Sequence, residues 1–218
     1  MKTITSEELK KIDSRYRARL VNSLSGIKSA NLIGTVDNNK RENLSIVSSC
    51  FHLGADPALM GVIFRPAVVE RHTYENIIST KYFTINHVHQ EIIESAHQTS
   101  ARYPREVSEF DSTGLTAQYQ KGFSAPFVKG CFIQIGLELK ESIHLEVNKT
   151  ELVIGEVKLI NISEKILMPD GFLDLASVNS IGVTGLDCYH TFEKGNRFSY
   201  AKPDQSSHKL TDEGELEI

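Results

Sequence analysis

Small polar side chains are concentrated in one short segment that has otherwise the character of a β-strand. The segment runs Asn43-Leu44-Ser45-Ile46-Val47-Ser48-Ser49-Cys50-Phe51-His52. Burying such side chains without hydrogen-bonding partners is costly, so they face either water or a ligand rich in donors and acceptors. An isoalloxazine ring, with its polar pyrimidine edge and large apolar face, fits the second alternative. An edge strand with its serines in water explains the same residues.

A second cluster places two arginines beside the expected start of a helix. Arg65-Pro66 is followed by Arg71-His72-Thr73, with Thr73 expected as the N-cap. Free N–H groups and the positive end of a helix favour an anion, and guanidinium binds phosphate through two parallel hydrogen bonds. The cluster is therefore a candidate phosphate site. The alternative is that both arginines pair with surface carboxylates such as Glu70 and Glu75.

The histidines and cysteines indicate less chemistry. His87 and His89 could offer two imidazoles to a metal, but no third ligand follows at a standard spacing, so no metal site is expected. Cys50 would lie near any ligand on the serine-rich segment, either in a redox role or as an inert buried thiol. The chain has no Gly-x-Ser-x-Gly elbow, Gly-x-Gly-x-x-Gly fingerprint or phosphate-loop motif. No catalytic side chain is predicted.

The composition excludes several classes of protein. With 218 residues, a formal net charge of -4 and a pI near 6.1, the chain lacks the basic surface of a general nucleic-acid binder. No window approaches the apolar length of a membrane span, and residues 1–8 are too polar for a secretory signal. Three widely spaced cysteines fit a reducing compartment. A cytoplasmic location and no membrane partner are therefore expected.

The elements that must position these residues are mostly strands. An amphipathic helix is expected up to residue 24, opened by a capping box of Thr5 and Glu8. Strands are expected over residues 30–36, 43–50, 59–64, 82–86, 129–138, 143–147 and 152–160, and further helices over 74–79, 90–100 and 173–179. Residues 103–126 form a long excursion. This pattern favours a mainly β fold with α decorations, an antiparallel barrel rather than a βαβ alternation.

Several of these runs, in this order, resemble the flavin-reductase-like FMN-binding split-barrel family, and its flavoredoxin-like branch in particular. The resemblance covers about residues 25–200. It is carried by Asn31-Leu32-Ile33-Gly34-Thr35, the serine-rich segment, Leu53-Gly54-Ala55-Asp56-Pro57, Arg65-Pro66, Arg71-His72-Thr73-Tyr74-Glu75-Asn76-Ile77, Tyr82-Phe83-Thr84-Ile85-Asn86, Ala96-His97-Gln98-Thr99-Ser100-Ala101 and Ala125-Pro126-Phe127-Val128. One small departure is Asp56-Pro57-Ala58, where the family usually has Asp-Pro-Pro. Gly185-Leu186-Asp187-Cys188-Tyr189 and Tyr200 also resemble this branch, without an evident function.

The resemblance implies a six-stranded antiparallel split β-barrel that forms a homodimer, with FMN near the subunit interface. It divides the chain into an N-terminal helix (1–24), the barrel domain (25–202) and a polar tail (203–218). The residues implied in isoalloxazine binding are Asn43, Ser45, Ser48, Ser49 and Cys50. Those implied in phosphate binding are Arg65, Arg71, His72 and Thr73, with Asn86 and His87 as neighbouring candidates.

The function implied is an FMN-dependent oxidoreductase that passes electrons from NAD(P)H or a redox protein, through FMN, to an acceptor. FMN itself would carry the chemistry. The main alternative is an FMN-binding electron carrier without turnover of its own. A third hypothesis, an oxidase of the pyridoxamine-phosphate type, ranks lower because the matching motifs belong to the reductase-like branch.

Overall fold

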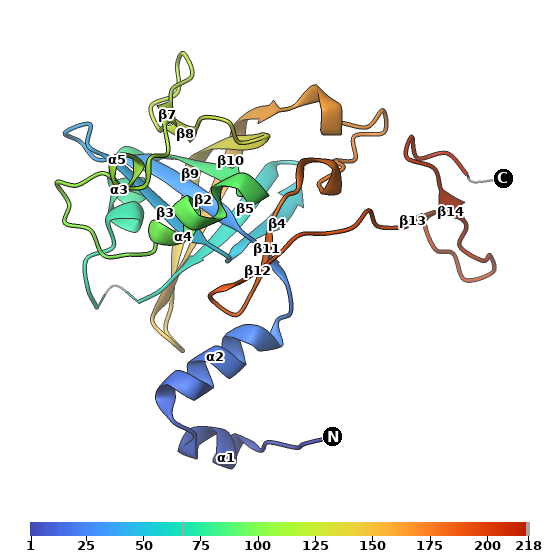
Figure 1. The fold of residues 1–218 in the computed structure, drawn as a ribbon, viewed down its shortest axis with the longest axis horizontal. Coiled ribbons are helices and arrows are strands. Elements are labelled where there is room, and N and C mark those ends of the chain that lie inside the picture. The colour runs from blue at the N-terminus through green and yellow to red at the C-terminus, as the bar shows by residue number, and fades with distance from the viewer. Residues whose placement is uncertain (67, 217–218) are drawn as a thin grey trace.

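A seven-stranded antiparallel sheet forms the centre of the computed structural model, which describes residues 1–66 and 68–216 (Figure 1). Its strand order is β3-β2-β6-β9-β10-β5-β4. The strands are β2 (Asn31–Val36), β3 (Glu42–Val47), β4 (Cys50–Ala55), β5 (Ala58–Phe64), β6 (Tyr82–His87), β9 (Ile133–Leu145) and β10 (Thr150–Ile162).

The two edge strands of this sheet, β3 and β4, are consecutive in the chain. Only Ser48 and Ser49 separate them, and so short a link spans no more than about 10 Å. The sheet must therefore curl until one end of its first strand lies beside its last strand. This confirms the mainly β, antiparallel barrel predicted from the sequence, with seven strands in the sheet where six were expected.

Helices and short strands decorate the barrel. The helices are α1 (Ser6–Lys11), α2 (Ser14–Leu24), α3 (His72–Thr80), η1 (Gln90–Ile92), α4 (Ile93–Gln98), α5 (Glu109–Thr113), η2 (Glu164–Ile166) and η3 (Ala176–Val178). The short strands are β1 (Lys28–Ser29), β7 (Ala117–Gln118), β8 (Phe127–Val128), β11 (Gly182–Thr184), β12 (Cys188–His190), β13 (Arg197–Phe198) and β14 (Lys209–Leu210). Within the described residues, no helix is long and apolar enough to cross a membrane.

Strand β2 shows how the core is divided. All six of its residues are buried, and neighbouring side chains of a strand point to opposite faces of the sheet. Ile33 packs in the cluster that also contains Phe83 and Leu137, whereas Leu32 packs with Phe110 and other residues of a second cluster. The sheet is therefore covered on both faces here, and α4 and α5 lie over the outer face.

Four predicted elements differ from those observed. The N-terminal helix is two helices, because Asp13 caps α2 by accepting hydrogen bonds from the N–H groups of Arg15 and Tyr16. The strand expected over 43–50 ends at Val47, where the chain crosses from one sheet edge to the other. The strands expected over 129–138 and 143–147 are one strand, β9, whose pairing with β10 continues through a register shift.

The C-terminal part was also predicted incompletely. Of the helix expected over 173–179, only the single turn η3 forms. Strands β13 and β14 pair with each other, so their hairpin straddles the boundary expected at residue 203. The hairpin and the helices α1 and α2 both project from the barrel (Figure 1).

Gly34 in β2 marks a close approach of two chain segments. A Cβ atom at this position would overlap the carbonyl oxygen of Pro126 and lie 2.7 Å from Thr84 Oγ1. Gly34→Ala is expected to lower the free energy of unfolding by about 3 kcal/mol, because backbone rather than a flexible side chain must move. Urea denaturation measures this. The control, Gly195→Ala, meets nothing within 4 Å and should change stability by less than about 0.5 kcal/mol; equal stability of both variants would contradict the close approach.

Candidate functional site

A cleft of about 1010 Å³ opens beside the sheet edge formed by β3. Its walls come from β3, the end of β5, the start of α3 and the segment that follows α4. Most of the side chains proposed from the sequence as flavin ligands line it: Asn43, Ser45, Ser48, Ser49, Arg65, Arg71, His72 and Thr73. The two polar clusters recognised in the sequence therefore line one cleft.

The hydroxyl of Thr73 joins β3 to α3. It accepts a hydrogen bond from Asn43 Nδ2 at 2.9 Å and lies 2.8 Å from the hydroxyl oxygen of Ser45. Asn76, on the same helix, donates from Nδ2 to Thr35 Oγ1 at 3.1 Å. The prediction of Thr73 as N-cap was wrong, because Arg71 holds that position and Thr73 lies inside the helix. The Thr73 hydroxyl is thus free to face the strand.

Two side chains to which the sequence assigned no role complete the edge of β3. The N–H of Leu44 donates to Glu109 Oε2 at 2.9 Å, and the N–H of Ile46 donates to Thr99 Oγ1 at 2.9 Å. Burial raises the pKa of the Glu109 carboxyl, and the Leu44 hydrogen bond opposes that rise. Both side chains also line the cleft. They satisfy outward N–H groups of an edge strand that would otherwise need water.

The two serines between β3 and β4 differ in their surroundings. Ser49 donates its hydroxyl to the carbonyl oxygen of Ile63 at 2.7 Å, which ties the crossing to β5. Ser48 lines the cleft beside it. Both serines therefore lie where the chain crosses from β3, at one edge of the sheet, to β4, at the other edge.

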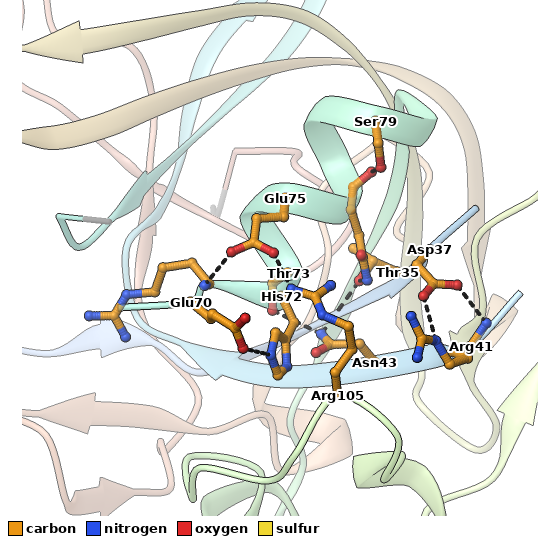
Figure 2. A network of polar contacts seen from close by, with 12 residues as sticks. Thr35, Asp37, Arg41, Asn43, Glu70, His72, Thr73, Glu75, Ser79 and Arg105 are labelled. Carbon is orange, nitrogen blue, oxygen red and sulfur yellow. Dashed lines mark hydrogen bonds and ion pairs between the residues drawn. The ribbon is translucent and has the colours of Figure 1, made fainter. Parts of the chain in front are cut away.

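The carboxylates near the arginines have other partners. Glu70 accepts from His72 Nε2 at 3.2 Å, and Glu75 forms an ion pair with Arg105 (Figure 2). Among the described residues, no ion pair involves Arg65 or Arg71. Pairing of these two arginines with Glu70 and Glu75, the alternative left open by the sequence, is therefore wrong.

Two further arginines lie near Arg71. Burial lowers the pKa of the Arg71 guanidinium, and the nearby cations Arg65 and Arg102 lower it further. The Nε atom of Arg71 donates to the Pro66 carbonyl oxygen at 3.4 Å, and its backbone N–H donates to Glu75 Oε1 at 2.8 Å. The side chains on this part of the cleft wall are thus suited to an anion.

His97 and Tyr189 are in contact at the cleft wall, and they come from two runs of the family resemblance to which no function was assigned. His97 Nδ1 lies 2.7 Å from the hydroxyl oxygen of Tyr189, and the rings pack edge to face with centroids 5.7 Å apart. Both line the cleft. Burial raises the pKa of Tyr189, and the charge of Asp187 adds to the effect, so the phenol stays protonated at neutral pH.

Comparison with known proteins identifies the family. The model of the flavin reductase like domain matches residues 24–172, which is more than half of the chain. The chain belongs to the flavin reductase-like family. A crystal structure from Shewanella frigidimarina, assigned as a flavin reductase with split barrel domain, is 49% identical, with a TM-score of 0.89, over 92% of this chain and 100% of that chain.

More distant structures share the fold of this flavin reductase-like chain. Flavoredoxin of Desulfovibrio vulgaris is 23% identical, with a TM-score of 0.68, over 83% of this chain and 93% of that one. An FMN-binding protein from Thermus thermophilus is 19% identical, with a TM-score of 0.68, over 83% and 93%. Among curated proteins, an uncharacterised one from Aquifex aeolicus is 32% identical over 44% of this chain. The chain spans about half the length of the curated relatives it matches.

Three residues implied by the family resemblance do not line the cleft. Asn86 is fully buried, and its amide donates to the Leu32 carbonyl and to Thr84 Oγ1 while accepting from the N–H of Val128. This side chain anchors β8 to the barrel. His87 lies at the end of β6, where burial lowers its pKa to about 4, so it is neutral at physiological pH.

The third of these residues, Cys50, packs against the barrel core. Burial raises the pKa of the Cys50 thiol to about 12, so little of the reactive thiolate exists at neutral pH. Its position favours the inert thiol over the redox role. Within the described residues there is also no group of three His, Cys, Asp or Glu side chains placed to hold a metal ion.

The three free cysteines are expected to differ in reactivity. Cys188 is exposed, whereas burial raises the pKa of Cys131, like that of Cys50, to about 12. Iodoacetamide at pH 8 should therefore alkylate only Cys188 in the folded protein and all three cysteines after unfolding, as mass spectrometry would show. Cys188→Ser is the control and should abolish labelling of the folded protein. If Cys50 is alkylated as fast as Cys188, its thiol is reactive and a redox role for Cys50 is again supported.

Proposed function

We propose that this flavin reductase-like protein binds FMN in the cleft and passes electrons from a reduced donor, NAD(P)H or a redox protein, to an acceptor. The observation that carries the proposal is that two groups of side chains, one polar and uncharged and one cationic, line the same cleft. Strand β3 and the Ser48–Ser49 crossing supply hydroxyl and amide groups, and Arg65 and Arg71 supply cations without a carboxylate partner. A flavin mononucleotide carries the matching pair, a polar ring edge and a phosphate.

The residues present fit this cofactor. The Asn43 and Ser45 side chains are already fixed by Thr73, so little conformational entropy is lost when they meet a ligand. Ile46, Val47 and Phe64 add apolar surface to the wall. The arginines can hold a phosphate by charge-assisted hydrogen bonds. When bound, the flavin supplies hydride and single-electron chemistry, while the chain binds it, orients it and limits access of water.

The proposal includes a homodimer in the cytoplasm. Helix α2 has no buried residue, and its Tyr16, Val21 and Leu24 are 57%, 45% and 71% exposed. A second copy of the chain would cover such an apolar surface. Three unpaired cysteines suit a reducing compartment. The donor, the acceptor and the dimer are parts of the proposal that the family alone does not specify.

The direct test of FMN binding is the visible spectrum of the purified protein. The proposal predicts the bands of oxidised flavin, or their perturbation on adding FMN to apoprotein, and the release of FMN on heating. Chromatography of the released pigment distinguishes FMN from FAD and riboflavin. A colourless protein that binds no added FMN would contradict the proposal.

Turnover separates the enzyme from the carrier. Steady-state oxidation of NADH or NADPH in the presence of free flavin should saturate in both substrates if the protein is a reductase. Reduction of the bound flavin once per molecule, without turnover, supports the electron carrier. Reduction by neither nucleotide nor any reduced carrier would exclude the electron-transfer proposal and leave FMN binding intact.

Removal of the Thr73 hydroxyl tests the junction between β3 and α3. Thr73→Val keeps the shape of the side chain but deprives Asn43 and Ser45 of a partner, and should weaken FMN binding about tenfold. Thr80→Val is the matched control, because the Thr80 hydroxyl bonds the Asn76 carbonyl on the same helix and does not line the cleft. Fluorescence titration with FMN gives both dissociation constants, and equal values for the two variants would contradict the junction's role.

A further inference from the structure

Three guanidinium groups line the cleft from two different parts of the chain. Arg65 follows β5 and Arg71 precedes α3, whereas Arg102 belongs to the segment that follows α4. Arg65 and Arg102 lie close enough to Arg71 to lower its pKa by charge repulsion. The site therefore gathers like charges, an arrangement that favours binding of an anion.

The acidic side chains near these three arginines bind other partners. Of the acidic side chains nearby, Glu70 is paired with His72, Glu75 with Arg105, and Glu109 with the N–H of Leu44. Arg102, like Arg65 and Arg71, takes part in no ion pair within the described chain. A phosphate monoester carries about -1.5 to -2 charges and can accept from several guanidinium groups at once.

The segment that carries Arg102 is held on both sides of that residue. Before it, Thr99 Oγ1 accepts from the N–H of Ile46 on β3. After it, Arg105 pairs with Glu75 on α3 (Figure 2). These two attachments hold the segment against β3 and α3, and Arg102 lines the cleft together with Arg65 and Arg71.

We propose that Arg102 completes a phosphate site with Arg65 and Arg71 across the cleft, and that this site makes the protein select phosphorylated over unphosphorylated flavin. The inference rests on the proposed FMN-binding function and goes beyond it by assigning Arg102 and the basis of selectivity. The selectivity is electrostatic, so the affinity for FMN falls with rising salt while that for riboflavin does not.

The test compares FMN with riboflavin in the full chain. Arg102→Ala should weaken FMN binding about tenfold to a hundredfold and change riboflavin binding less than about twofold, both measured by flavin fluorescence titration. Arg102→Lys, which keeps the charge but loses the paired donors, should fall in between. Arg41→Ala is the charge-matched control, because Arg41 pairs with Asp37 and does not line the cleft. It should leave both affinities unchanged.

Inorganic phosphate supplies a readout that needs no flavin. It should raise the thermal midpoint of the wild type and of Arg41→Ala, but not of Arg102→Ala. Equal losses for FMN and riboflavin, or unchanged FMN binding in Arg102→Ala, would overturn the inference while the proposed function stands. Failure of the wild type to bind either flavin would refute the proposed function. In that event, a phosphate-induced rise of the thermal midpoint that occurs in the wild type and is lost in Arg102→Ala still supports the anion site. If phosphate does not stabilise the wild type, the anion site is overturned as well.

Discussion

The hydrogen-bonded junction at Thr73 is the constraint on which the candidate site depends. Asn43 and Ser45 lie on one edge of the barrel, and Thr73 is the second residue of α3, yet a single hydroxyl binds both strand side chains. This contact sets the distance between the polar edge of β3 and the arginines before α3. Ile77 and Asn76 dock α3 on the barrel, and the Thr73 hydroxyl adds the direct link between the two polar clusters.

The way the barrel closes explains why the cleft forms at this place. An edge strand exposes unpaired N–H and C=O groups, and β3 must end beside β4 because only two residues join them. Glu109 and Thr99 satisfy N–H groups of β3 with side chains instead of another strand. A further strand would have buried the edge. Side chains from α4 and α5 leave room for a ligand between the edge and the segment that follows α4.

Much of this arrangement could be predicted from local sequence patterns. The capping box of Thr5 and Glu8 forms as expected, because its two hydrogen bonds join residues of one helical turn. The strands around Leu32 and Phe83 were located correctly by their apolar character. The serine-rich and arginine clusters were both recognised by residue type, and the order of motifs identified the family.

The features that could not be predicted depend on contacts between distant residues. The strand crossing at Ser48 and Ser49 looks like continuous strand until the partner edges are known. Asn86 is polar like a ligand residue, but its amide is bonded to Thr84 on its own strand and to Leu32 and Val128 on two other strands. Arg102 shows no special spacing in the sequence. Only the fold shows that Arg105 pairs with Glu75 while Arg102 lines the cleft.

The most direct test of the central claim is the map of amide chemical-shift changes when FMN is added to ¹⁵N-labelled protein. The changes are expected to concentrate at residues 43–49, 71–74 and 99–102, with the β13–β14 hairpin unaffected. Changes confined to other surfaces, or none at saturating FMN, would contradict the assignment of this cleft as the flavin site.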